Sequence, residues 1–104
     1  MFTVILQDRT GKELARHRRE GNEKFLLRND RRFPILSQLD VASYDVFSQE
    51  QASLLHVELL EIYKGLVEGA DRDHVADLLE MVFRASNLDG ATITFTPFSK
   101  PLAG

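Results

Sequence analysis

The feature that most constrains the fold is a pair of adjacent amphipathic helix patterns in the second half of the chain. Ser48 and Gln51 have the spacing of a capping box, in which each side chain bonds the backbone N–H of the other residue. Apolar residues then recur every three or four positions, which predicts a helix over about 48–68. A second such pattern runs from Asp71, its expected cap, to Ala85, and its apolar stripe includes Phe83. The connector "GAD" is so short that it predicts an antiparallel hairpin of the two helices.

Strand patterns lie on both sides of this hairpin. The first strand, near 2–7, is apolar on both faces and is therefore expected inside the sheet. The second, near 13–19, carries repeated basic side chains, which are typical of an edge strand. Further strands are predicted near 35–39 and 91–96, and the last has the alternation of a half-buried strand. Residues 24–28 fit either a short strand or a single helical turn.

The predicted fold class is therefore α+β. A small antiparallel or mixed sheet of about four strands, in the order β-β-β-α-α-β, is covered on one face by the helix hairpin. A chain of 104 residues with 43% apolar residues fits one domain with a single core. We expect this domain to span residues 1–97 and residues 98–104 to form a flexible C-terminal tail.

Composition narrows the classes of protein that this chain can represent. The sequence contains no cysteine, which excludes disulfides, thiolate metal sites and cysteine nucleophiles and fits a reducing compartment. No apolar run approaches the ~20 residues of a membrane span. Met1 is followed directly by a strand-like run, without the basic segment that begins a secretory signal. We therefore expect a cytoplasmic protein with no membrane association.

Charge is distributed unevenly along the chain, whose net charge is −3. Residues 1–34 hold nine basic and five acidic residues, whereas the remainder holds four basic and eleven acidic ones. This asymmetry can mark a nucleic-acid face or a partner-binding face, but we favour the simpler interpretation that opposite charges meet across the folded domain or are solvated. Acids interrupt the basic stretch and the pI is near 5.5, so nucleic-acid binding is not expected. The candidate partner-binding residues are Glu61, Asp73, Asp77, Arg16, Arg18 and Arg19.

The acidic side of the helix hairpin is expected to form a solvated outer face or a docking face for a basic protein. Its members are Glu58, Glu61, Glu68, Asp71, Asp73, Asp77 and Glu80. Within the first helix, Gly65 is explained by close packing against the second helix, or by the approach of a partner or ligand. Val46 and Phe47 are expected to plug the core where that helix begins.

No catalytic residue, cofactor site or metal ligand is predicted. The three histidines lack metal-ligand spacing, and the chain has no glycine-rich phosphate loop or nucleophile motif. One candidate junction site remains, because paired carboxylates can perform acid–base chemistry when burial raises one pKa. It comprises Asp40, Tyr44, Asp45 and Glu58. Asx turns explain both aspartates more simply, and we favour that interpretation.

Residues 33–60 contain "FPILSQLD", then "VF", then a Gln followed by spaced leucines and a Glu-Leu pair. Together these segments resemble a family of small uncharacterised bacterial proteins. The family pattern is an aromatic-Pro-Leu-Leu segment, an Asp, a Pro-Tyr-Gly-Asp-Thr turn, Val/Ile-Phe, a Gln and Leu-x-Glu-Leu. The matching residues here are Phe33, Pro34, Leu36, Asp40, Val46, Phe47, Gln51, Leu55, Glu58 and Leu59. The segment "VASYD" replaces the family's turn. The resemblance implies a small cytosolic bacterial domain and no particular activity.

The leading functional hypothesis is a non-enzymatic domain that binds another protein, whose identity the sequence does not specify. Its size, its acidity and its lack of catalytic motifs suit a regulatory accessory role or one of the immunity or antitoxin type. A homodimer formed through sheet edges or the helix hairpin is a second possibility. The alternative class is a small hydrolase or ligand-binding protein that uses the carboxylates at the strand–helix junction.

Overall fold

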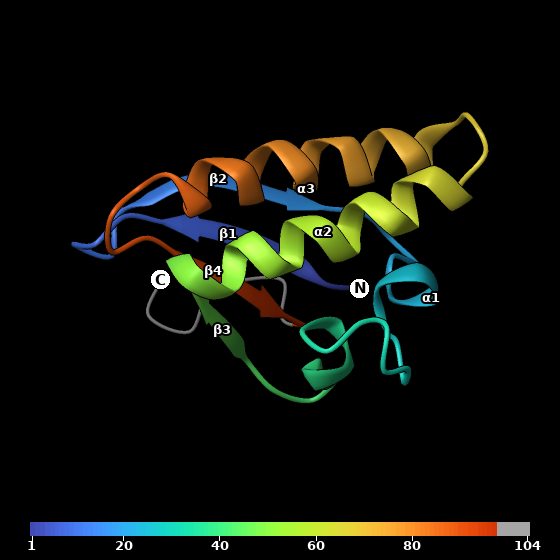
Figure 1. Cartoon of the computed structure of the whole chain (residues 1–104), viewed down its shortest axis with the longest axis horizontal. Helices are drawn as coiled ribbons and strands as arrows, with labels where there is room; N and C mark the ends of the chain where they lie inside the picture. The colour runs from blue at the N-terminus through green and yellow to red at the C-terminus, as the bar shows by residue number, and fades with distance from the viewer. Residues whose placement is uncertain (98–104) are drawn as a thin grey trace.

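The fold consists of a four-stranded sheet and two long helices in a computed structural model that describes residues 1–97 (Figure 1). The tail predicted at 98–104 lies outside the described residues. The elements in chain order are β1 (Thr3–Gln7), β2 (Glu13–Arg18), α1 (Glu23–Leu26), a 3₁₀ turn (Leu36–Gln38), β3 (Asp45–Ser48), α2 (Gln49–Gly65), α3 (Ala70–Ser86) and β4 (Thr92–Thr96). This architecture confirms the predicted α+β class and the helix pair over the sheet.

The sheet is antiparallel throughout, and its strands lie in the order β2-β1-β4-β3. The two interior strands are β1 and β4, which pair from Thr3 opposite Thr96 to Gln7 opposite Thr92. The prediction that the first strand lies inside the sheet and the basic second strand at its edge is therefore confirmed. The expectation of a half-buried last strand was wrong, because Thr94 and Thr96 are as buried as the apolar residues of β4.

The strand predicted at 35–39 is a 3₁₀ turn, and the third strand lies ten residues later at Asp45–Ser48. Within the turn, the Gln38 N–H donates to the Ile35 carbonyl and the Leu39 N–H to the Leu36 carbonyl. These local bonds use the groups that a strand would offer to its neighbours. The ambiguous residues 24–28 contain the short helix α1, which ends at Leu26.

The start of α2 agrees with the sequence pattern. The Gln51 N–H donates to Ser48 Oγ at 3.3 Å, and the Ser48 N–H donates to Gln51 Oε1 at 2.9 Å, which confirms the capping box. The helix ends at Gly65 rather than near residue 68. The next helix begins after Gly69, whose φ of +146° suits a residue without a side chain. Asp71 therefore lies in the first turn of α3 and is not its cap.

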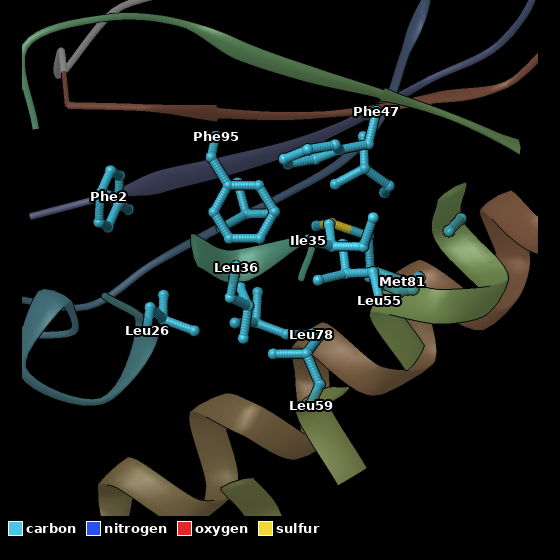
Figure 2. Packing of buried hydrophobic residues seen from close by; sticks show 14 of the residues in the cluster. Phe2, Leu26, Ile35, Leu36, Phe47, Leu55, Leu59, Leu78, Met81 and Phe95 are labelled. Atoms are coloured by element: carbon cyan, nitrogen blue, oxygen red, sulfur yellow. The ribbon is translucent and has the colours of Figure 1, made fainter. Parts of the chain in front are cut away.

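The hydrophobic core lies between one face of the sheet and the helix pair (Figure 1). Figure 2 shows the rings of Phe47 and Phe95 and the side chains of Leu55 and Met81 gathered in this layer. The Phe47 and Phe95 rings meet edge to face with their centroids 5.8 Å apart, a geometry that adds about 0.5–1.5 kcal/mol to area burial. Phe47 therefore plugs the core as expected. Val46 does not, because its side chain is exposed on the opposite face of β3.

Candidate protein-interaction surface

Two aspartates of the predicted junction site, Asp40 and Asp45, act within one turn. The Asp40 N–H donates to Asp45 Oδ2 at 3.0 Å, and the Ala42 N–H donates to Asp40 Oδ1 at 2.8 Å. The second contact is the Asx-turn bond that the sequence led us to favour. Tyr44 lies half-buried immediately before β3. Both carboxylates thus hold the backbone that leads from the 3₁₀ turn into the sheet.

Glu58 lies inside the protein, and the expectation that it belongs to the solvated acidic face was wrong. Its side chain is only 4% exposed, and its carboxylate faces the start of the 3₁₀ turn. The Ile35 N–H donates to Oε2 at 2.9 Å, and the Leu36 N–H donates to Oε1 at 2.9 Å. These amides belong to the first turn of a helical segment, where backbone donors have no partner within the helix. Glu58 therefore anchors residues 33–39 to α2.

Four of the six candidate partner-binding residues, Arg18, Arg19, Asp73 and Asp77, line one hollow between the end of β2 and α3. Arg16 donates to Glu13 in its own strand, with Nη2 and Oε1 2.6 Å apart. Glu61 lies on α2, where its carboxylate is 3.8 Å from Lys64. Asp73 and Asp77 lie on α3, are exposed and form no ion pair within residues 1–97. Arg16 and Glu61 are not among the residues that line this hollow.

The basic and acidic regions of the chain meet at Asp71. Arg19 Nε lies 2.8 Å from Asp71 Oδ1, and Lys24 Nζ lies 2.9 Å from Oδ2. Hydrogen bonds from Arg19 and then Lys24 hold the pKa of Asp71 below its usual value. The charge asymmetry is therefore partly neutralised within the domain, because two of the nine basic residues of the first third form ion pairs with α3.

Large apolar side chains are exposed on the helix pair, away from the core. Leu54, Val57 and Phe83 are 56%, 59% and 58% exposed, respectively. The sequence pattern assigned Phe83 to the buried stripe of its helix, and this assignment was wrong. Leu54 and Val57 were not identified at all, although they lie outside the spacing of the buried residues of α2. The Phe83 ring is instead 6.0 Å from the ring of His56 on α2, measured between centroids.

A hollow of about 670 Å³ adjoins Phe83 at the C-terminal end of α3. Its apolar lining comes from three residues of different segments: Leu14 of β2, Phe83 of α3 and Leu88 of the following loop. Arg84 and Asn87 complete the rim. The edge strand and α3 thus form an apolar depression next to the exposed ring.

A second, polar hollow of about 240 Å³ lies near the other end of α3. Its lining includes His17, Arg18, Arg19, Ala70, Asp73, His74 and Asp77. The hollow is lined by both arginines and aspartates. Within residues 1–97, no group of three or more His, Asp or Glu residues could hold a metal ion. This hollow joins the end of β2 to the acidic first half of α3.

His74 is buried beneath this hollow and belongs to a network that holds the N-terminal strand. Asn22 pairs with both backbone groups of Phe2, accepting its N–H at Oδ1 and donating to its carbonyl from Nδ2. Asn22 Nδ2 also lies 3.2 Å from His74 Nε2, so we assign the ring proton of neutral His74 to Nδ1. Burial lowers the pKa of His74, and the neighbouring His17 lowers it further.

Comparison with known protein families, curated proteins and solved structures yields no match. The resemblance of residues 33–60 to small bacterial proteins stays a prediction. No helix within residues 1–97 is long and apolar enough to cross a membrane.

Proposed function

We propose that this protein is a non-enzymatic interaction domain that binds another protein through the outer face of α2 and α3. The observation that carries the proposal is the exposure of Leu54, Val57 and Phe83 on helices whose opposite sides form the core. Exposed apolar side chains bordered by polar residues are a feature of interaction surfaces. An exposed aromatic ring is also a frequent anchor in such interfaces.

The charge of the helix pair supports the same function. Residues 49–86 contain eight acidic and three basic side chains, and among the acids only Glu58 is buried. An acidic surface accelerates the approach of a basic partner and discourages acidic ones. We infer a regulatory accessory role in the cytoplasm, in which binding itself is the activity.

The hydrolase alternative is less well supported by the geometry of the junction. Asp40, Asp45 and Glu58 all accept hydrogen bonds from backbone N–H groups of the surrounding turns. The turn and the anchor of the 3₁₀ segment depend on these bonds. Acid–base chemistry at this junction would therefore compete with the structure that forms it.

The proposal is tested by affinity capture from lysate of the producing cells with two matched double variants. Val57→Ser with Phe83→Ser removes exposed apolar groups from the helix pair. Val41→Ser with Val46→Ser removes side chains of equal exposure elsewhere. We expect the wild-type chain and the second variant to retain the same specific protein, and the first variant to lose it.

Equal recovery on both variants, or no specific protein on the wild-type chain, would contradict the proposal. Thermal unfolding of each variant checks that it is folded. Light scattering of the wild-type chain at high concentration tests the homodimer hypothesis. A dimer that Val57→Ser with Phe83→Ser converts to a monomer would make a second copy the partner.

A further inference from the structure

An acidic row runs along the first half of α3. Asp73, Asp77 and Glu80 are separated by four and three residues, which places them on one side of the helix. With a rise of 1.5 Å per residue, the row is about 10 Å long. All three side chains are exposed. The row therefore presents three carboxylates to any molecule that approaches this side of α3.

The row is not neutralised by ion pairs within residues 1–97. Asp71, two residues before Asp73, forms contacts shorter than 3 Å with both Arg19 and Lys24, whereas no carboxylate of the row lies within 4 Å of a cation of residues 1–97. Arg18 lines the polar hollow beside the row and forms no ion pair there. Arg19 and Lys24 are thus engaged with Asp71, and Arg72 stacks on the ring of Tyr63. Arg18 and Arg84 lie at the two ends of the row, beside the polar and the apolar hollow.

The apolar hollow continues the row toward the C-terminal end of α3. Phe83 follows Glu80 by one helical turn and lines the hollow together with Leu14 and Leu88. From Asp73 to Ser86 the helix extends about 20 Å, the length of roughly six extended residues.

We propose that this strip of α3 binds a segment of another protein that is rich in lysine and arginine and carries one large apolar side chain. The cations lie along Asp73, Asp77 and Glu80, and the apolar side chain enters the hollow beside Phe83. This inference rests on the proposed interaction function and specifies the partner. Nucleic acid is repelled by the same carboxylates.

The test selects a phage-displayed library of random 12-residue peptides on the full chain, and then measures synthetic copies of enriched peptides by fluorescence anisotropy. We expect enriched sequences with several Lys or Arg residues and one large apolar residue. Asp73→Asn with Asp77→Asn should weaken binding about 2- to 30-fold, the effect of removing two exposed charge pairs. Phe83→Ser should weaken binding at least about tenfold, as expected for an aromatic anchor.

The matched control is Glu50→Gln with Glu68→Gln, which removes two exposed acids outside the row and should change affinity by less than about twofold. Raising the salt concentration should weaken binding to the wild-type chain. Enrichment of acidic or neutral peptides, affinity that is indifferent to Asp73 and Asp77, or no enrichment at all would overturn the inference. If the peptide test fails but Val57→Ser with Phe83→Ser still abolishes capture of a protein from lysate, the proposed interaction function stands and only the inference about a basic segment is rejected.

Discussion

Replacing Glu58 with leucine tests the role of the buried carboxylate as a structural anchor. The substitution keeps the approximate volume of the side chain but leaves the N–H groups of Ile35 and Leu36 without acceptors. Each buried donor without a partner costs about 1–3 kcal/mol, so we expect the free energy of unfolding to fall by about 2–6 kcal/mol. That loss is a large share of the ~5–15 kcal/mol typical of a whole domain.

Urea unfolding at neutral pH measures this loss, and Glu61→Leu provides the control one turn along the same helix. Glu61 is exposed and only 3.8 Å from Lys64, so its replacement should change the free energy of unfolding by less than about 0.5 kcal/mol. Glu58→Gln keeps one acceptor oxygen, so its loss in free energy of unfolding should lie between those of the two leucine variants, at about 1–3 kcal/mol. Hydrogen exchange should show the amides of Ile35 and Leu36 protected only while Glu58 is present. A Glu58→Leu protein as stable as the control would refute the anchor.

Two further predictions concern the packing around α3 and the sheet. Burial lowers the pKa of His74, so the fold is more stable when this side chain is neutral. This stabilisation is complete above about pH 6.5, the pKa of histidine in the unfolded chain. It is lost as the pH falls through the lowered pKa of the folded protein. Urea unfolding between pH 8 and pH 5 should show this loss, and a stable His74→Leu variant with the same pH dependence as the wild type would contradict it. Gly90→Ala should destabilise the fold by more than about 1 kcal/mol, because φ is +78° and a Cβ would lie 2.7 Å from Arg9 Cβ. Gly65→Ala meets no atom within 4 Å and should be neutral or stabilising by up to about 1 kcal/mol; equal thermal shifts for the two alanine variants would refute this distinction.

The absence of atoms near Gly65 also shows which part of the sequence interpretation was wrong. Close packing against the second helix was the expected reason for this glycine, but it is the exposed last residue of α2. Helix periodicity predicted the two helices well, since that signal is local and repeated over several turns. It could not locate their ends, where one residue can decide between continuation and a turn.

Short elements without repeated patterns were harder to predict. The pattern at 35–39 has apolar residues but is too short to separate a strand from a helical turn, and β3 has only four residues before α2 begins. Glu58 had a recognisable signal, because it lies three residues after Leu55 and four before Ile62 in the buried stripe. The hydrogen-bond donors to Glu58 could not be inferred, because these backbone N–H groups need an acceptor only once the 3₁₀ turn has formed.

The acidic charge of the candidate surface was predictable from the sequence, but its exposed aromatic side chain was not. The acids of α3 are visible in the sequence, and Asp73 and Asp77 remain exposed without ion pairs in the described part of the chain. The engagement of Asp71 by Arg19 depends on a contact between residues 52 positions apart. The exposure of Phe83 depends on how the two helices cross, which periodicity within one helix does not determine.

Site-specific photo-crosslinking tests the central claim most directly. Benzoylphenylalanine is introduced at Phe83 in one chain and at Val46, which is equally exposed on β3, in another. Both chains are irradiated in the producing cells, and the adducts are identified by mass spectrometry. We expect a specific protein adduct at position 83 and none at position 46. The same adducts at both positions, or an adduct only at position 46, would contradict a binding face on α2 and α3.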